Sequence, residues 1–243
     1  MTSSNDLVGQ RVAVLGGTSG IGLAVAEAAA GAGAAVTVAS SRKENVERAL
    51  DRLPAGADGQ VADLTDAANV RELFDRLGEI DHLVYTAGDP LLLAPVAEID
   101  LAAARDFFAV RYFGALAAVQ AAVPKLRAGG SITLTSGTAG ARPMPGTAVT
   151  SSLCTAMEGL TRALAVELAP IRVNAVMPGV VRSNLWAPLP GEAREQLYEA
   201  TAAAAPLKRV GEVEDIADAY LFYMTQRHAT GTVLMLDGGS VLV

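Results

Sequence analysis

The chain has 243 residues, enough for one large α/β domain or two small ones, and its content of 51% hydrophobic and 19% charged residues is typical of a globular protein. Its formal net charge of −7 argues against nucleic acid as a partner, because an acidic surface repels phosphates. A single cysteine excludes an internal disulfide, and with only two histidines no His/Cys metal cluster can form, so no metal is expected.

The N-terminal segment has neither the basic nor the apolar region of a signal peptide. No uninterrupted apolar run reaches the length of a membrane span. We therefore expect a cytoplasmic protein without a membrane partner.

A glycine-spaced turn near the start of the chain is the first motif. Residues Val12–Leu15 predict a short buried strand, and an alanine-rich helix former begins at Leu23. Between them, Gly16, Gly20 and Gly22 allow a tight turn and a close approach of the backbone to a ligand. The unpaired N–H groups at the helix start would face an anion, such as a dinucleotide pyrophosphate. The alternative is a merely structural turn.

The rest of the chain alternates predicted strands with predicted helices. Further strands are expected at residues 34–39, 59–62, 81–85, 131–134, 171–176 and 232–236. Further helices are expected at residues 44–53, 66–77, 100–127, 150–168 and 212–225. This alternation predicts one α/β domain over residues 1–243, with a doubly wound parallel seven-stranded sheet and helices on both faces.

Residues 183–206 carry Trp186 and three prolines and are predicted to form a lid over the site. Ligands are expected at the carboxyl ends of the strands. Small or polar residues follow four of those ends: Asp63-Leu64, Thr86-Ala87-Gly88, Thr135-Ser136 and Pro178-Gly179. Asp63 either accepts a hydrogen bond from an adenine amino group or caps the following turn.

The end of the second predicted strand bears on the choice of cofactor. An acidic residue about 20 positions after the glycine turn would hold a ribose 2′-hydroxyl, whereas an arginine accommodates a 2′-phosphate. Here Ser41 and Arg42 occupy the strand end, and the first acid is Glu44, already inside the next predicted helix. This pattern favours NADP(H) over NAD(H). The alternative is that Arg42 and Lys43 are solvated residues at the start of a helix.

Together these motifs resemble the short-chain dehydrogenase/reductase family over nearly the whole chain. The resemblance also rests on residues 160–168, on Ile171–Asn174 and on the late Asp237-Gly238-Gly239. It implies a Rossmann fold, a dimer or tetramer, and a small-molecule substrate. The cofactor contacts that it implies are Gly16, Thr18, Ser19, Gly20, Ile21, Gly22, Ser41, Arg42, Asp63, Leu64, Thr86, Ala87, Gly88, Pro178, Gly179, Val181 and Ser183.

The same resemblance implies a catalytic tetrad of Asn, Ser, Tyr and Lys, of which only the Ser is matched, by Ser136. Thr150 stands at the Tyr position, Cys154 at the Lys position and Arg111 at the Asn position, and no Tyr-x-x-x-Lys occurs in the sequence. In the family the Tyr is the general acid/base, the Lys lowers its pKa, and the Ser orients the substrate oxygen.

The three replacements change what the site can do. Threonine is a far weaker acid than a phenol, whose ordinary pKa is about 10, so Thr150 cannot readily shuttle a proton. Cys154 lies one helical turn later and could do so, although a buried cysteine is more often inert. Arg111 stays protonated and cannot be a base, but it can supply a fixed positive charge or hold a carboxylate. The alternative for Arg111 is a helix-surface residue at a subunit contact.

Three functions remain open on the sequence. The first is an NADP(H)-dependent oxidoreductase acting on a carbonyl or alcohol, which the family favours. The second is a catalytically silent cofactor-binding sensor or oligomer partner, and the third is redox-neutral chemistry in the same pocket. Residues 91–93, Met144 and residues 186–190 suggest a mainly apolar pocket, or else ordinary loop packing. Helix 150–168 carries an apolar stripe that serves either subunit pairing or sheet packing.

Overall fold

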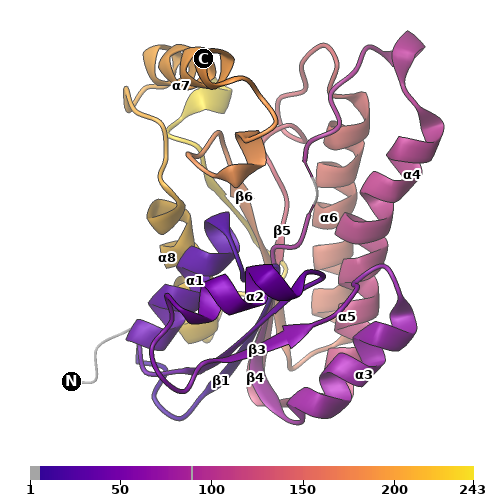
Figure 1. Ribbon diagram of the computed structural model, residues 1–243, viewed down its shortest axis with the longest axis vertical. Helices are drawn as coiled ribbons and strands as arrows, with labels where there is room; N and C mark the ends of the chain where they lie inside the picture. Colours follow the sequence, from indigo (N-terminus) through magenta and orange to yellow (C-terminus); the bar gives the residue numbers. More distant parts are fainter. Residues whose placement is uncertain (1–5, 89) are drawn as a thin grey trace.

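Seven strands form one parallel sheet in the order β3-β2-β1-β4-β5-β6-β7, in a computed structural model that describes residues 6–88 and 90–243 (Figure 1). The chain starts in the middle of the sheet and builds outward in both directions, so β1 lies between β2 and β4. A crevice for a ligand is expected at such a reversal, beyond the carboxyl ends of the strands. The strands are β1 Arg11–Leu15, β2 Ala35–Ser40, β3 Asp58–Val61, β4 Ile80–Tyr85, β5 Leu126–Thr135, β6 Arg172–Pro178 and β7 Val233–Leu236.

Helices cover both faces of this sheet, as Figure 1 shows. On one face lie α1 Gly20–Gly31, α2 Lys43–Leu50 and α8 Val213–Thr225. On the other lie α3 Ala67–Leu77, α4 Leu101–Phe108, α5 Gly114–Ala122 and α6 Ala148–Glu167. The predicted doubly wound α/β fold is confirmed.

The two hydrophobic cores follow from the alternation of side chains along the strands. In β1, Ala13 and Leu15 pack into the core beneath α3, α5 and α6, while Val12 and Val14 pack beneath α1 and α8. Since both faces are covered, β1 and β4 are almost wholly buried and β6 is buried along its whole length. This is why the strands read as short apolar runs rather than as alternating ones.

The single long helix predicted at residues 100–127 is wrong. The segment is α4, then a π-helical turn Ala109–Phe113, then α5 and a 3₁₀ turn Val123–Lys125. At the π turn the Gly114 N–H donates to the Ala109 carbonyl, five residues back instead of four. Pro124 has no N–H to donate, and β5 already begins at Leu126, which pairs with Ile80 of β4.

The same segment, Leu101–Lys125, is long and apolar enough to cross a membrane by length and composition alone. Four buried apolar residues of α5, namely Ala115, Ala118, Val119 and Ala122, pack into the core next to the sheet. Packing within the domain therefore accounts for the apolar residues on this buried side of the segment.

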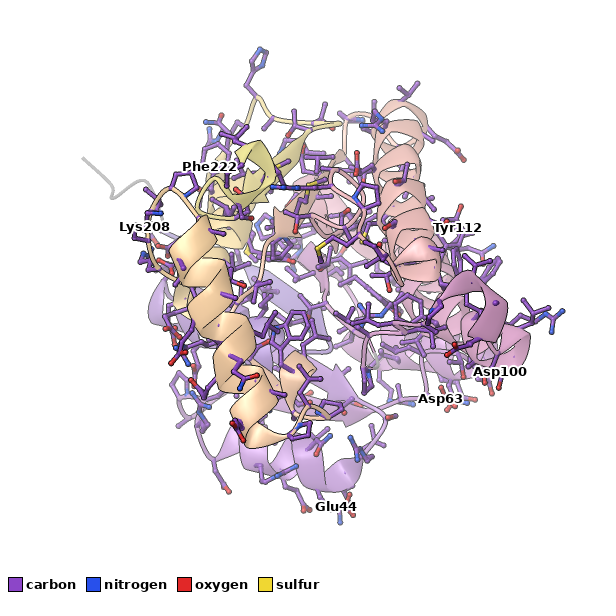
Figure 2. All side chains as sticks on the ribbon, turned by 90° about the horizontal axis from the view of Figure 1, so that it is seen from above. Glu44, Asp63, Asp100, Tyr112, Lys208 and Phe222 are labelled. Carbon is purple, nitrogen blue, oxygen red and sulfur yellow. The ribbon has the colours of Figure 1, made fainter. Side chains whose placement is uncertain are left out.

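Residues 183–206 form a 3₁₀ turn, Asn184–Trp186, followed by α7 Gly191–Ala204. Figure 2 shows α7 in the foreground of the view from above. Arg182, just before the segment, contacts α7 twice: Nη1 lies 3.2 Å from the Glu195 carboxylate, and Cζ lies 4.4 Å from the Tyr198 ring centroid. The movement of a lid stays a prediction.

Candidate active site

The glycine turn packs against the end of β4. A Cβ built on Gly16 would lie 2.5 Å from the Ala87 nitrogen, and one built on Gly22 would overlap the Gly16 carbonyl and the Thr86 hydroxyl. Thr86 ties the two segments together, because its N–H and its hydroxyl both donate to the Leu15 carbonyl, at 2.9 Å and 3.2 Å. The two predicted cofactor segments therefore meet, and glycine is required for the contact.

Helix α1 begins directly after this turn and offers its N-terminus to a ligand. Its N-cap residue, Ser19, makes no side-chain capping hydrogen bond, and the first turn carries no acidic residue. Gly20 has a φ of +51°, and a Cβ built on it would lie 3.6 Å from the Ser183 Cβ. Ser183 thus lies next to the turn, while Thr18 and Ile21 lie within the turn and at the start of α1. N–H groups at such a helix start suit a phosphate.

The end of β2 places Ser41 and Arg42 in exposed positions at the start of α2. Lys43 is directed along its own helix, since its Nζ lies 3.3 Å from the Glu47 carboxylate. In the view from above, Glu44 of α2 lies at the lower edge of the molecule (Figure 2).

Asp63 shapes the turn that follows β3. Its Oδ1 accepts hydrogen bonds from the Thr65 N–H at 2.9 Å and from the Thr65 hydroxyl at 2.7 Å. The next residue, Leu64, is buried in the core. Asp63 was expected either to contact an adenine or to cap the following turn. The structure shows the hydrogen bonds of the cap.

The end of β6 lies against the last strand. The Gly179 N–H donates to the Leu236 carbonyl, and a Cβ built on Gly179 would lie 2.8 Å from the Asp237 Cβ. After Pro178 and Gly179 the chain continues to the buried Val181, whose carbonyl accepts a hydrogen bond from the Trp186 indole at 3.0 Å. Trp186 therefore fixes the start of the α7 segment.

Ser136 and Cys154 are neighbours at the carboxyl end of β5. The Ser136 hydroxyl donates to the Cys154 carbonyl at 3.0 Å, and a Cβ built on Gly137 would lie 3.2 Å from the Cys154 Sγ. Burial raises the pKa of the Cys154 thiol. The Arg111 charge, the Gly140 N–H and the Ser136 hydroxyl oppose this effect, and Glu158 adds to it.

Arg111 extends from the π turn toward the same region. Its guanidinium carbon lies 4.7 Å from the centroid of the Phe107 ring. A Cβ built on Gly88 would lie 2.5 Å from that carbon, so the guanidinium packs on the Gly88 backbone. The structure thus brings two predicted catalytic residues, Ser136 and Cys154, into contact, and the charge of a third, Arg111, acts on the Cys154 thiol.

Thr150 is held differently. It is buried, and its hydroxyl donates to the Leu92 carbonyl at 2.9 Å. Leu91 and Leu92 pack against the core, whereas Leu93 and Met144 are exposed. The leucine-rich loop therefore serves in part to hold Thr150, and only its last residue is exposed.

Tyr85, the last residue of β4, was not predicted as a site residue. It is buried, and its hydroxyl donates to the Val110 carbonyl of the π turn at 2.5 Å. Its place directly before Thr86-Ala87-Gly88 is the only signal that could have pointed to it.

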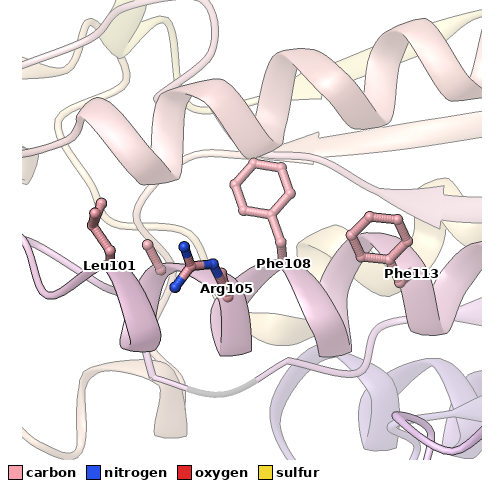
Figure 3. Close-up of a pocket in the computed structure, with 5 residues that line it drawn as sticks. Leu101, Arg105, Phe108 and Phe113 are labelled. Carbon is pink, nitrogen blue, oxygen red and sulfur yellow. The ribbon is translucent and has the colours of Figure 1, made fainter.

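A hollow of about 350 Å³ lies on α4 and the π turn (Figure 3). None of its described lining residues is a predicted site residue; they are Leu101, Ala104, Arg105, Phe108 and Phe113. Within the described part of the chain, no group of three or more His, Cys, Asp or Glu residues could hold a metal ion.

Comparison with known proteins gives relatives over the full length. The family model of an SDR-like Rossmann domain matches residues 3–243. The short-chain dehydrogenase/reductase ucsE of Acremonium sp is 40% identical over 254 residues, covering 95% of each chain. The short-chain dehydrogenase/reductase malC of Malbranchea aurantiaca is 34% identical over 258 residues, covering 98% of this chain and 97% of its own.

Solved structures agree with this similarity. A small-chain dehydrogenase crystallised in complex with NADPH has a TM-score of 0.82 and 33% identity, covering 96% of this chain and 99% of its own. The MalC Reductase/Diels-Alderase from Malbranchea aurantiaca has a TM-score of 0.90 and 31% identity, covering 99% and 100%. The chain therefore belongs to the short-chain dehydrogenase/reductase family and has its oxidoreductase fold.

Proposed function

We propose that the protein is an NADP(H)-dependent oxidoreductase that transfers hydride between the nicotinamide and a carbonyl or alcohol of a mainly apolar small molecule. One observation carries the proposal: the Arg111 guanidinium packs on Gly88, directly after the residues that contact the glycine turn, and its charge acts on Cys154, whose carbonyl binds the Ser136 hydroxyl. A hydroxyl donor and a fixed cation are thus near the place where a substrate oxygen would gain negative charge. Similarity to a dehydrogenase in complex with NADPH supports the choice of cofactor.

The residues around the glycine turn fit a dinucleotide. The N–H groups at the start of α1 have no side-chain cap to compete with a pyrophosphate, and Ser183 lies against the turn. Exposed Ser41 and Arg42 would hold a ribose 2′-phosphate, because a guanidinium pairs well with phosphate oxygens. NADPH bound in this way supplies a hydride to the carbonyl carbon of the substrate.

The protein's own groups then stabilise the oxygen and position it. We propose that the Ser136 hydroxyl leaves the Cys154 carbonyl and donates to the substrate oxygen, while Arg111 stabilises the negative charge that develops there. Reduction to the alcohol consumes one proton, and we assign water as its source. The Thr150 hydroxyl already donates to Leu92, and burial holds the Cys154 thiol protonated.

This proposal makes the active site atypical for the family. Thr150 and Cys154 stand at the Tyr and Lys positions of the family. We propose that neither of them replaces the tyrosine as the general acid/base. General acid/base catalysis contributes about 10²- to 10⁴-fold to rate, so we expect slower turnover than with an intact tetrad.

We also propose a homo-oligomer. The apolar stripe of α6 covers the sheet, since Leu153, Met157 and Leu164 are buried in the core. Exposed apolar side chains remain on the neighbouring helices, at Leu101 and Phe113.

The test is NADPH oxidation across a panel of apolar ketones, with NADPH binding measured by fluorescence titration. Ser136→Ala should keep NADPH binding and lower kcat/KM roughly 100-fold, the loss found when one donor to a developing oxyanion is removed. Ser152→Ala, on the exposed side of α6, is the matched control and should behave as wild type. Binding without turnover over the whole panel, or unchanged turnover in Ser136→Ala, would contradict the proposal.

A further inference from the structure

The π turn that carries Arg111 leaves one backbone carbonyl to be satisfied from outside the helix. In an α-helix the Val110 carbonyl would accept from the Gly114 N–H, but that N–H donates to Ala109 here. The Tyr85 hydroxyl reaches the Val110 carbonyl instead, at 2.5 Å, from the end of β4. The Tyr85 hydroxyl thus replaces the Gly114 N–H as the donor to the Val110 carbonyl.

The chain makes room for this contact at Gly114. A Cβ built on Gly114 would lie 2.5 Å from the Tyr85 hydroxyl and 2.8 Å from the Leu64 carbonyl. An alanine there would collide with both atoms. The first residue of α5 is therefore a glycine although glycine disfavours a helix, and the tyrosine explains the exception.

Tyr85 itself is held firmly in the sheet. Its side chain is buried, and its backbone carbonyl accepts a hydrogen bond from the Thr135 hydroxyl at 2.6 Å. The Thr135 hydroxyl in turn lies 2.7 Å from the Tyr220 hydroxyl of α8. A fixed group therefore supports the π turn, and Arg111 directly follows the carbonyl that it holds.

We propose that Tyr85 is a positioning residue, whose hydroxyl holds the π turn at Val110 and thereby keeps the Arg111 guanidinium against Gly88, facing the site. Without that hydrogen bond the Val110 carbonyl is best satisfied by a regular α-helical turn. That rearrangement shifts the register of the helix by one residue and turns Arg111 about 100° around the helix axis. The inference rests on the proposed function for its effect on turnover.

The single cysteine of the chain reports on the position of Arg111 without any need for turnover. Among the described residues, the charged groups that act on the Cys154 thiol are Arg111, which lowers its pKa, and Glu158, which raises it. The experiment measures the pH dependence of Cys154 alkylation by iodoacetamide. Arg111→Met should raise the pKa of the thiol, and Tyr85→Phe, which removes only a hydroxyl, should raise it in the same direction.

The double variant Tyr85→Phe/Arg111→Met separates positioning from a general loosening of the fold. If Tyr85 acts through Arg111, the double variant titrates as Arg111→Met alone. Tyr112→Phe is the matched control, because Tyr112 lies in the same π turn and its hydroxyl makes no hydrogen bond within the described part of the chain. It should titrate as wild type. Circular dichroism establishes that each variant is folded.

Kinetics give the second measurement. Tyr85→Phe should lower kcat about 3- to 10-fold, the worth of one neutral hydrogen bond, and leave the Kd of NADPH unchanged. It should have no further effect on kcat in the Arg111→Met background. A wild-type thiol titration in Tyr85→Phe, or an equal effect with and without Arg111, overturns the inference. If Arg111→Met keeps full turnover, the proposed role of Arg111 fails, and the thiol titration still decides for or against Tyr85.

Discussion

The two halves of the site are built by different means. Around the glycine turn the close contacts include backbone atoms, as where Gly16 meets the Ala87 backbone and Gly22 meets the Gly16 carbonyl. Around Ser136 they are between side chains and glycine, as where Arg111 packs on Gly88 and Cys154 on Gly137. A backbone contact restricts the residue to glycine whatever its neighbours are, whereas a side-chain contact can change with its partner. The half around the glycine turn, called the backbone half below, therefore keeps the geometry that binds the cofactor. The half around Ser136, called the side-chain half, can exchange its side chains and with them its catalytic chemistry.

The largest effect on stability and NADPH binding should come from a substitution in the backbone half of the site. Gly22→Ala places a Cβ on the Gly16 carbonyl, so we expect a loss of about 3 kcal/mol in the free energy of unfolding and a loss of NADPH binding. Gly31→Ala is the control in the same helix, because a Cβ built there meets nothing within 4 Å. Urea denaturation compares the two. Equal stability of both variants would show that the backbone contact imposes no restriction.

At low pH the domain should unfold as one unit, so that both halves of the site are lost at the same pH. His82 of β4 is buried, with Nδ1 2.8 Å from the Ser131 hydroxyl, and burial and the Arg172 charge lower its pKa to about 4 against the opposing charge of Asp81. Because the unfolded state binds this proton at a higher pH, stability is lost as pH falls from about 6.5 toward 4, by about 3 kcal/mol.

Denaturation followed at several pH values tests this expectation. His82→Gln should flatten the pH dependence over that interval. NADPH binding and burial of the Cys154 thiol should be lost at the same pH. If one is lost well before the other, the two halves do not unfold as one unit.

Arg42, which follows the end of β2, should determine the preference for NADPH over NADH. Arg42→Ala should weaken NADPH binding roughly 10- to 100-fold, the range for a hydrogen bond to a charged group, and leave NADH binding nearly unchanged. Arg48→Ala is the control on the same helix, since the Arg48 side chain bonds to the helix itself. Fluorescence titration with both nucleotides measures the ratio. Equal weakening for NADH would argue against a 2′-phosphate contact.

The smallest effect on stability should come from the side-chain half. A Cβ at Gly88 meets the far end of a flexible side chain, so Gly88→Ala should cost about 1 kcal/mol or less. It should displace the Arg111 guanidinium, lower kcat, and leave NADPH binding intact. Thermal unfolding and steady-state kinetics measure both. A destabilisation as large as that of Gly22→Ala would remove the distinction between the two halves.

The same distinction explains how much the sequence predicts. The strands and most of the helices follow from local patterns of apolar and small residues, whereas the contact between the glycine turn and Thr86-Ala87 is seen only in the structure. The π turn does not follow from such patterns, because it depends on a hydroxyl from Tyr85, 25 residues away in the chain. The same holds for Thr150, whose hydroxyl is bound by Leu92, 58 residues away. Contacts between distant side chains leave no periodic signal in the sequence.

The hydroxyls of Tyr220 and Thr135 connect the layers of helices on the two faces of the sheet. Tyr220 belongs to α8 on one face of the sheet, and Val110, at the other end of the series, belongs to the helical layer on the opposite face. A sliding of α8 along the sheet therefore strains a buried hydrogen bond that leads, through Tyr85, to the turn bearing Arg111. Glu212, the N-cap residue of α8, lies 3.6 Å from Arg182, so an exposed ion pair connects the start of the α7 segment to the helix that carries Tyr220.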